Sequence, residues 1–452
     1  MSDLRRVFKA YDVRGAYPEA IDEPLARRIG RATAVHLGAR TALVGHDMRR
    51  SSPSLAAALI DGLREQGTDV TFIGEASSPL VYYAGRDFDA AVAVTASHNP
   101  LPDNGMKICG PDAEPIGSAN GLWTIRDLVA GGDFPAAPRR GTLDTLEPRR
   151  AFVDDSLAFL HLRRRFRVVV DGANGMGGPD YQELARRDSP LEILPLYLDP
   201  DDDFPHHEPN PLVFDNLRDL QAEVRRTGAD LGIALDGDGD RCVFVDEQGA
   251  VVTADLATAL IAPEVLREHP GTPILFDVRS SRVVAEEIRA AGGRPVECRV
   301  GHAFIKKALR DEQAHFGGEL SGHFYFREAA CAENTLLALF RLLNLLDRRG
   351  CTLSQAVAPL RRYHSSGEIN SRVDRVENRL QALRDKYRDG EISTLDGLKV
   401  SYSTWWFNVR PSNTEPLLRL VVEAADAEEL QARTRELLTL IRNPLPRSGP
   451  CP

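Results

Sequence analysis

Short apolar runs alternate with helical patterns along most of the chain. The runs that predict strands cover residues 41–45, 69–74, 90–95, 167–171, 231–236 and 273–277. A helix is predicted from Ser51 to about Arg64, directly after the first strand. Strands separated by helices of about 10 to 15 residues are typical of βαβ units in parallel or mixed sheets. The pattern predicts an α/β fold, and its repetition predicts three similar α/β domains.

Aspartates mark the ends of several of these strands. Each one follows a short apolar strand and begins a polar turn: Asp47, Asp171, Asp236 and Asp277. In open α/β sheets, ligands bind at the carboxyl ends of the strands. We therefore expect each of the three domains to contribute one such loop to a ligand site.

The pattern changes after about residue 362. Residues 362–389 are strongly charged, with apolar residues at helical spacing between Val373 and Leu383. Alternating strands are then predicted at 398–402, 405–409 and 418–422, and a helix at 427–441. This order predicts a small α+β domain at the end of the chain. The domains we expect are residues 1–148, 149–250, 251–362 and 363–452.

Composition narrows the class of protein. Of 452 residues, 42% are hydrophobic and 27% charged, which is typical of a globular protein. The 66 acidic and 56 basic residues give a net charge of −10, which argues against nucleic acid as the main partner. No apolar run reaches the roughly 18 residues of a transmembrane helix, so no membrane partner is expected.

Targeting and cysteine signals indicate a cytoplasmic protein. The first six residues are polar and charged, unlike a signal peptide. The six cysteines show neither a CxxC pair nor a zinc-binding spacing, which favours reduced thiols. We expect small-molecule partners and a monomer or homodimer.

Ser97 is predicted to lie in a turn that directly follows an apolar run. Residues 94–100 read Val-Thr-Ala-Ser-His-Asn-Pro, with Ser97 at the centre. Ser97 can be a capping serine in a turn or an activated nucleophile. A Ser-His-Asp hydrolase is a further alternative. However, the G-x-S-x-G pattern is absent, and the adjacent Ser97 and His98 are not expected to form the usual hydrogen bond.

Three carboxylates follow another apolar run at a spacing of two, in Asp236-Gly-Asp238-Gly-Asp240. They repel one another unless a cation is bound, and a few ligands from one loop suit Mg²⁺. An EF-hand is disfavoured, because Arg241 stands where that loop needs glycine and both flanks predict strands. An acidic hairpin turn is the remaining alternative. Together with Ser97, the loop points to phosphoryl transfer through a serine.

Further loops carry residues that suit a sugar phosphate. Residues 317–323 place Glu319, Ser321 and His323 between glycines, and residues 410–416 combine an arginine with hydroxyl and amide groups. A glycine-rich connection and an ST-turn are the structural alternatives. Four other residues lie in suggestive places: Lys9, Tyr11 and Arg14 near the glycine turn of residues 8–15, and Lys107 close after Ser97. His302 is either a proton shuttle or a structural loop histidine.

These motifs, in this order, resemble the α-D-phosphohexomutase superfamily, most closely its bacterial phosphomannomutase/phosphoglucomutase branch. The resemblance runs from residues 11–15 to residues 410–416, and residues 199–211 also fit this branch. It implies four domains around a central cleft, three similar mixed-sheet α/β domains and a C-terminal α+β domain. It also implies an isomerase that moves a phosphoryl group between the 1- and 6-positions of mannose or glucose phosphates, through a phosphoserine and a bisphosphate intermediate.

The resemblance implies a role for each candidate residue. Ser97 would be the phosphoserine and would hold Mg²⁺ together with Asp236, Asp238 and Asp240. Residues that would assist catalysis are Lys107, Arg241, His302 and Arg14. Residues that would bind the substrate are Lys9, Tyr11, His98, Arg279, Glu319, Ser321, His323, Arg410, Ser412, Asn413 and Thr414. A hexose 1,6-bisphosphate would prime the serine.

Some positions depart from the family pattern and leave alternatives open. His46 replaces a usual arginine, Arg279 replaces a usual lysine, and residues 332–334 (Ala-Glu-Asn) replace an Asp-Gly pair. In the sequence, all lie outside the serine and aspartate motifs. A phosphoglucosamine mutase is one alternative, although that branch usually has glycine where Asn413 stands. The others are a metal-dependent phosphatase and a non-catalytic sugar-phosphate-binding relative.

Overall fold

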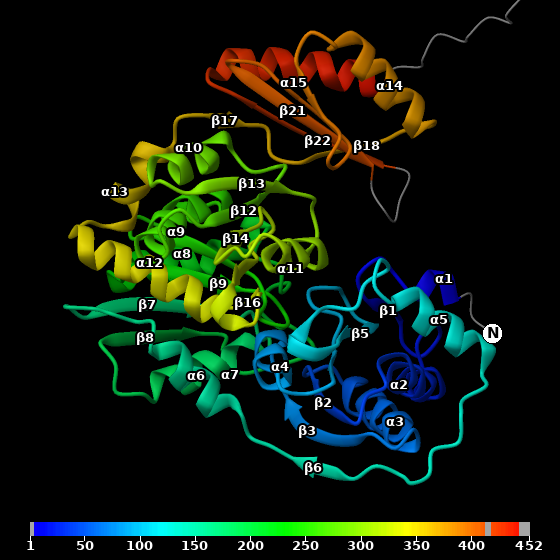
Figure 1. The fold of residues 1–452 in the computed structure, drawn as a ribbon. Coiled ribbons are helices and arrows are strands. Elements are labelled where there is room, and N and C mark those ends of the chain that lie inside the picture. Colours follow the sequence, from blue (N-terminus) through cyan, green and yellow to red (C-terminus); the bar gives the residue numbers. More distant parts are fainter. Residues whose placement is uncertain (1–3, 412–416, 443–452) are drawn as a thin grey trace, which may run out of the picture.

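The computed structural model describes residues 4–411 and 417–442, which form four sheets that follow one another along the chain. Figure 1 shows the first sheet with its helices in blue and cyan, and the second and third in green and yellow. The fourth, in orange and red, lies beyond the third. The fold is therefore the expected four-domain α/β arrangement with a C-terminal α+β domain.

The first sheet is mixed. Its strands are β1 (Val13–Ala16), β2 (Thr41–His46), β3 (Asp69–Glu75), β4 (Ala90–Val94), β5 (Asp103–Cys109) and β6 (Leu143–Thr145). Its helices are α1 (Leu4–Val7), α2 (Glu23–Leu37), α3 (Ser52–Glu65), α4 (Ser78–Gly85), η1 (Pro111–Ala113) and α5 (Leu122–Gly131). The strand order is β1-β5-β4-β2-β3-β6, in which β4, β2, β3 and β6 are parallel neighbours.

The second sheet is also mixed, in the order β11-β10-β9-β7-β8. The strands are β7 (Phe166–Asp171), β8 (Leu191–Leu196), β9 (Leu231–Leu235), β10 (Cys242–Asp246) and β11 (Val251–Val252). The helices are α6 (Arg149–Leu157), α7 (Gly177–Ala185), η2 (Phe214–Leu217) and α8 (Arg218–Thr227). Strand β9 pairs in parallel with β7 and antiparallel with β10, so a hairpin loop joins β9 to β10.

The third sheet repeats this mixed pattern in the order β13-β12-β14-β15-β16. The strands are β12 (Pro273–Asp277), β13 (Arg294–Cys298), β14 (Phe316–Gly318), β15 (Phe324–Phe326) and β16 (Ala332–Glu333). The helices are α9 (Ala254–Glu268), α10 (Arg282–Ala290), α11 (His302–Asp311), η3 (Arg327–Ala329), α12 (Thr335–Arg349), α13 (Leu353–Val357) and η4 (Ala358–Leu360).

The fourth sheet is antiparallel and is covered by helices on one face (Figure 1). Its elements are β17 (His364–Ser365), β18 (Ile369–Arg372), α14 (Val376–Lys386), β19 (Glu391–Ser393), β20 (Leu398–Ser401), β21 (Trp405–Pro411), β22 (Leu417–Ala424) and α15 (Ala427–Arg442). The predicted strands of this region and the last helix are confirmed. Strands β17 and β18 were not predicted, because two and four residues are too few to show an alternation.

The hydrophobic cores are not distributed equally among the four domains. One continuous core runs from Leu43 in the first sheet through Phe244 in the second to Phe316 in the third. The fourth sheet has a separate core, which includes Val400, Phe407 and Ile441. The first three domains are therefore joined by apolar burial, while the last one has an apolar core of its own.

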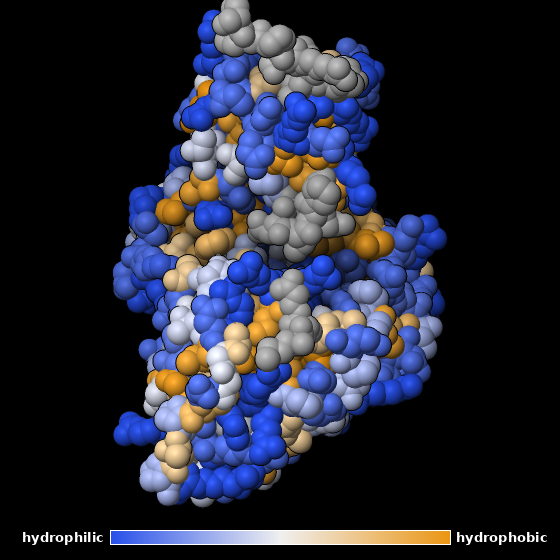
Figure 2. Space-filling view, turned by 90° about the vertical axis from the view of Figure 1, so that its right-hand side faces the viewer, coloured by the Kyte–Doolittle hydropathy of each residue, from blue (hydrophilic) through white to orange (hydrophobic). Residues whose placement is uncertain are grey.

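Hydrophilic residues cover much of the face shown in Figure 2, and hydrophobic residues form smaller groups between them. Within residues 4–411 and 417–442, none of the helices combines the length and apolar character needed to cross a bilayer.

A buried arginine holds the turn that follows β4. Arg49 is 1% exposed, and its guanidinium donates hydrogen bonds to the carbonyl oxygens of Ser97 at 3.0 Å and Asp103 at 2.9 Å. It donates a further bond, of 2.5 Å, to the Asn99 carbonyl and forms an ion pair with Asp47. Because one planar group bonds several carbonyls, Arg49 fixes the shape of residues 97–103.

Arg49→Met should destabilise the protein, because it leaves these buried carbonyls and Asp47 without their donor. We expect a loss of about 3 kcal/mol in the free energy of unfolding, measured by urea denaturation. The matched control is Arg50→Met, whose side chain is 75% exposed and whose ion pairs with Asp202 and Asp203 should contribute less than about 1 kcal/mol. Equal losses in the two variants would contradict the role given to Arg49.

Candidate active site

Ser97 lies in the loop after β4 and faces the loop between β9 and β10. It is 3% exposed, and its Oγ donates a 3.0 Å hydrogen bond to Oδ2 of Asp236. Its backbone has a left-handed φ of 54°, and its N–H donates to the Thr95 hydroxyl at 2.9 Å. Few residues other than glycine adopt this conformation without local support. The serine hydroxyl is therefore aimed at the aspartate loop by a backbone that Arg49 and Thr95 hold in place.

Ser97 and His98 are in contact, but not through the nitrogen that a catalytic triad uses, so the usual Ser–His hydrogen bond is not formed, as expected. Ser97 Oγ lies 3.1 Å from His98 Nδ1, and the left-handed φ of Ser97 accompanies this contact. The Ser-His-Asp alternative is still not supported, because no carboxylate among the described residues hydrogen-bonds to His98. Arg241 and burial hold the pKa of His98 well below its ordinary value. His98 is therefore a neutral neighbour of the serine, without the carboxylate that orients a triad histidine.

The three aspartates form a buried cluster. Asp236, Asp238 and Asp240 are 0%, 1% and 3% exposed, and one oxygen of each lies within 4.8 Å of the others. The strands on both sides of the loop form a hairpin, as the turn alternative expects, and not the helices of an EF-hand. An ordinary hairpin turn would expose these carboxylates. Their burial side by side indicates a site for a cation.

Lys107 on β5 neutralises part of this cluster. Its Nζ lies 2.5 Å from Asp238 and 2.6 Å from Asp240, and the Ser78 hydroxyl also donates to Asp238. Burial and the two neighbouring carboxylates raise the pKa of Asp236 well above its ordinary value. Burial opposes ionisation of Asp240 too, but Lys107 holds its pKa well below the usual range. One lysine does not balance three carboxylates, so the loop keeps capacity for a divalent cation.

The donor set fits Mg²⁺. Oδ1 of Asp238 is buried and has no hydrogen-bond partner in the described part of the chain. The three aspartates offer oxygen ligands only, and Ser97 places a fourth oxygen, Oγ, beside Asp236. Mg²⁺ prefers oxygen ligands and keeps several positions for water or phosphate. A cation bound here would lie against the serine.

The close approach of the two loops depends on glycine. A Cβ added at Gly237 would lie 2.5 Å from the carbonyl oxygen of Ser97. Because real side chains do not approach a carbonyl this closely, only glycine allows the aspartate loop to reach the serine.

The third domain contributes the loop between β14 and β15. Glu319 accepts hydrogen bonds from the Gly301 N–H and the Tyr325 hydroxyl, both at 2.8 Å. His323 Nδ1 lies 3.0 Å from Glu319 and 2.9 Å from the Ser321 hydroxyl, so the three predicted sugar-contact residues are brought together. Its Nε2 lies 3.4 Å from Asp240, which links this loop to the aspartate cluster.

Charged side chains connect the aspartate loop to the loop between β14 and β15. Burial opposes protonation of His323, but Asp240 raises its pKa to about 9. Arg241 joins both loops, since its Nε lies 3.2 Å from His323 Nε2 and its backbone N–H donates to Asp236 at 3.1 Å. The Ser97, Asp236–Asp240 and Glu319–His323 loops therefore form one connected site.

The N-terminal candidates reach this site to different degrees. Arg14 donates 2.6 Å hydrogen bonds to Asn99 in the serine loop and to Asp12. Tyr11 contacts the third domain, with its hydroxyl 3.4 Å from the Val300 carbonyl and its ring edge-on to His302. The Lys9 N–H closes a turn with the Asp12 carbonyl, but within the described residues the Lys9 side chain makes no hydrogen bond or ion pair.

His302 begins α11 and is half-buried. Burial, followed by Lys306 one turn along the helix, holds its pKa well below the ordinary value. Its Nδ1 is buried without a hydrogen-bond partner in the described part of the chain. The imidazole is therefore neutral at neutral pH and able to accept a proton.

Arg410 and Arg279, two of the expected substrate-binding residues, lie near the junction of the third and fourth domains. Arg410 on β21 donates a 2.8 Å hydrogen bond to Glu368. Arg279 follows β12, is bound through two nitrogens to Asp277, and has another nitrogen 3.6 Å from Glu368. Ser412, Asn413 and Thr414 lie outside the described residues.

The departures from the family pattern have local partners. His46 is buried, lies 2.7 Å from the Asp47 carbonyl through Nδ1 and stacks on Phe72. Asn334 caps α12 by accepting from the Leu337 N–H. Glu333 pairs with Lys306 at 2.6 Å, and both are fully buried.

Glu333 is nearer to the site than its place in the sequence indicates. One of its oxygens lies within 4.8 Å of ligand atoms of Asp240 and His323. Sequence reasoning also assigned no role to Arg49, Ser78 or Glu368. Arg49 could have been noticed in the sequence, because it lies close to Asp47 at the end of a predicted strand. Neither Ser78 nor Glu368 belongs to a recognisable motif.

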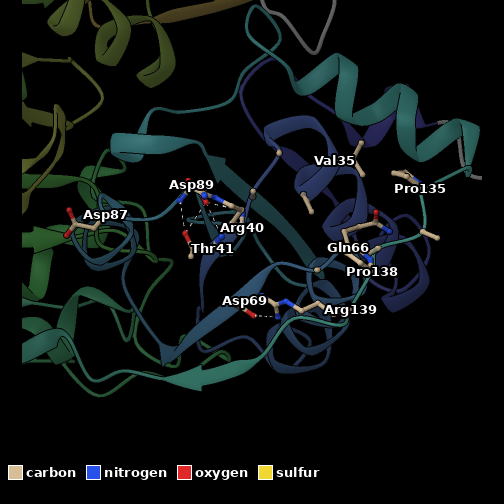
Figure 3. Close-up of a pocket in the computed structure, with 16 residues that line it drawn as sticks. Val35, Arg40, Thr41, Gln66, Asp69, Asp87, Asp89, Pro135, Pro138 and Arg139 are labelled. Atoms are coloured by element: carbon tan, nitrogen blue, oxygen red, sulfur yellow. Dashed lines mark hydrogen bonds and ion pairs between the residues drawn. The ribbon is translucent and has the colours of Figure 1, made fainter.

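A surface hollow lies away from these residues, on the first domain. It has a volume of about 950 Å³ and lies between the end of α2 and residues 135–139 (Figure 3). Asp69 is paired with Arg139 at 2.7 Å there, and Asp89 accepts from the Arg40 and Thr41 N–H groups. None of the candidate site residues lines this hollow.

Comparison with known proteins agrees with this arrangement. The chain matches domains described as "Phosphoglucomutase/phosphomannomutase", alpha/beta/alpha domains I, II and III, over residues 5–134, 151–249 and 253–363. The C-terminal domain of the same family matches residues 368–439. Together these four matches cover most of the chain.

Individual relatives extend over nearly the whole length. "Phosphohexose mutases" of Xanthomonas campestris pv. campestris (strain B100) are 39% identical over 96% of this chain and 99% of the relative. "Phosphomannomutase" of Escherichia coli (strain K12) is 36% identical over 96% of this chain and 98% of the relative. A solved "Phosphoglucomutase/phosphomannomutase family protein" from Burkholderia thailandensis superposes with a TM-score of 0.89 at 32% identity, covering 97% of this chain and 98% of the other.

A more distant structure, of Aspergillus fumigatus N-acetylphosphoglucosamine mutase, is described in complex with GlcNAc-6P and magnesium, and at 13% identity it shares only the fold. The domain matches and the full-length relatives show that this chain belongs to the phosphoglucomutase/phosphomannomutase family of the α-D-phosphohexomutase superfamily and is an isomerase of the mutase type.

Proposed function

We propose that this enzyme interconverts the 1-phosphate and 6-phosphate of mannose, of glucose or of both, through phosphorylated Ser97 and a hexose 1,6-bisphosphate. The observation that carries the proposal is the buried contact of Ser97 Oγ with Asp236 in a three-carboxylate loop. A serine placed against a cation site suits phosphoryl transfer, since the cation neutralises charge on the transferred group. We also propose that the enzyme acts in the cytoplasm, as a monomer or homodimer.

The proposed cation is Mg²⁺, held by Asp236, Asp238, Asp240 and an oxygen of Ser97 or its phosphate. When bound, Mg²⁺ supplies charge stabilisation to the transferring phosphoryl group. Lys107 and Arg241 add fixed positive charge on either side of the loop. Because Lys107 is buried and Arg241 is half-buried, and both already contact the aspartates, little reorganisation would be required during the reaction.

The chemistry proceeds in two transfers. In the first, the free hydroxyl of a hexose phosphate attacks the phosphorus on Ser97, the Oγ–P bond breaks, and the hydroxyl proton passes to a base. We assign that role to His302, whose buried Nδ1 has no hydrogen-bond partner in the described part of the chain and can accept a proton. In the second transfer, Ser97 takes the other phosphoryl group from the bisphosphate, and the protonated base returns the proton to the vacated sugar oxygen.

Both transfers use the same serine, so the bisphosphate must turn over between them. We assign the sugar hydroxyls to Glu319, Ser321 and His323, and the non-reacting phosphate to Arg410, Arg279 and residues 412–414. A loop that recognises hydroxyls and a separate cationic clamp would accept either orientation. Arg14, Tyr11, Lys9 and His98 complete the proposed substrate contacts. The domain boundaries expected from the sequence, near residues 148, 250 and 362, are part of this proposal.

A coupled assay of mannose 1-phosphate and glucose 1-phosphate, with Mg²⁺ and glucose 1,6-bisphosphate, should show turnover on at least one sugar. Ser97→Ala should lower that turnover by at least about a thousandfold, because the covalent route is lost. Ser54→Ala, in the exposed part of α3, is the matched control and should retain it. Near wild-type turnover in Ser97→Ala would contradict the proposal, and turnover of glucosamine 1-phosphate alone would favour the sister branch.

Removal of divalent cations should abolish turnover reversibly. We expect EDTA-treated enzyme to recover activity on addition of Mg²⁺ and to gain several degrees in melting temperature, since a ligand bound to the folded state stabilises it. Asp238→Asn should reduce both responses, while Asp246→Asn, at the far end of β10, should keep the Mg²⁺ response of activity. Full activity in EDTA would remove the cation from the proposed reaction.

Arg410→Ala should raise the KM for the hexose phosphate by about ten- to a hundredfold, because a charge-assisted contact to phosphate is lost. Steady-state kinetics measures this, with Arg372→Ala on the exposed face of β18 as the control. An unchanged KM would remove Arg410 from the phosphate site.

A further inference from the structure

Glu368 lies near the start of the fourth domain, in the loop between β17 and β18. Its side chain is 23% exposed, and both of its oxygens contact arginines. Oε2 lies 2.8 Å from Nη2 of Arg410 and 3.6 Å from Nη1 of Arg279, and Oε1 lies 3.0 Å from Nη1 of Arg419. One carboxylate therefore meets guanidinium groups from two domains.

Arg279 is held independently of Glu368. Asp277 binds it in a fork, with contacts of 3.1 and 2.7 Å that use Nε and Nη2 and leave Nη1 directed towards Glu368. The backbones of Arg410 and Arg419 are directly opposite each other on β21 and β22. The sheet therefore keeps two arginines side by side near Arg279, which concentrates positive charge at this place.

Glu368 is the counter-charge to this arginine group. Burial opposes its ionisation, but Arg410 and Arg279 lower its pKa below the ordinary value, so the side chain is a carboxylate at neutral pH. A carboxylate and a phosphate present the same acceptor chemistry to a guanidinium, namely anionic oxygens that take charge-assisted hydrogen bonds. The Nη2 of Arg410 that meets Glu368 is therefore a donor that a substrate phosphate would use.

We propose that Glu368 is an internal competitor for the phosphate clamp: its carboxylate occupies Arg410 and Arg279 in the substrate-free enzyme, and the non-reacting phosphate of the substrate displaces it. This inference rests on the proposed function, which assigns Arg410 and Arg279 to that phosphate. In this proposal Glu368 lowers the affinity for phosphate, and phosphate binding is linked to the contact of Glu368 in the fourth domain with Arg279 in the third.

The position of Glu368 in the chain gives this exchange a second consequence. The fourth domain has its own hydrophobic core and meets the third through polar contacts. These include Lys399 with Glu297, Arg282 with the Ser403 carbonyl at 2.9 Å, and the Val300 N–H with Asp396 at 3.1 Å. Displacement of Glu368 would exchange one such tie for a substrate phosphate. The fourth domain would then be connected to Arg279 through the ligand instead of through Glu368.

Glu368→Gln tests the proposal, because glutamine keeps the size of the side chain and removes its charge. We expect both the KM for the hexose 1-phosphate and the inhibition constant of inorganic phosphate to fall by about three- to tenfold. In an Arg410→Ala background the same substitution should change either constant much less, since the clamp through which it acts is gone. Glu297→Gln is the matched control: it breaks another carboxylate tie between the third and fourth domains without touching these arginines.

The following results would overturn the proposal. If Glu368 only orients the arginines, Glu368→Gln will raise both constants, and that result overturns the proposal. Unchanged constants, or an equal fall in Glu297→Gln, overturn it as well. If Glu368→Gln does not fold, as judged by circular dichroism, Glu368→Asp replaces it, since the shorter carboxylate reaches Arg410 less well and should also lower both constants. Failure of Arg410→Ala to raise KM contradicts the phosphate clamp itself and so separates the two claims.

Discussion

The structure depends on the burial of three carboxylates at one hairpin loop. Asp236, Asp238 and Asp240 cannot share a buried space unless positive charge surrounds them. Lys107 from the first domain, Arg241 beside the loop and His323 from the third domain supply part of that charge. The electrostatic requirement of one loop thereby draws three domains to a common point, and Ser97 is placed against it.

The fourth domain is attached by a different kind of interaction. Among residues 363–411 and 417–442, the hydrophobic core is separate from that of the other domains, and charged and polar pairs hold this domain to the third. Such contacts exchange readily with a charged ligand, whereas a buried apolar contact does not. In the proposed reaction, a buried centre for phosphoryl transfer would be combined with a domain whose attachment responds to phosphate. Both properties would suit a substrate that has to be released, turned and held again.

Much of the fold and of the candidate site could be predicted from the sequence, and the features that could not have physical reasons. The strands that end at Asp47, Asp171 and Asp277 were predictable because buried apolar runs are long enough to show a pattern. Strands β17 and β18 were not, because their pairing with β22 decides them. The Ser97–His98 contact could not be anticipated without the left-handed φ of Ser97. Arg49, Ser78, Glu333 and Glu368 act through partners far away in sequence, which spacing alone does not reveal.

The central claim is that Ser97 carries the phosphoryl group. Its most direct test is peptide mass spectrometry of the wild-type enzyme after incubation with glucose 1,6-bisphosphate and Mg²⁺, followed by exposure to excess hexose 1-phosphate. The account predicts one added phosphoryl group, located on Ser97 and lost again when the acceptor sugar is supplied with Mg²⁺. A phosphoryl group on another residue, or none on Ser97 under conditions that sustain turnover, would contradict it.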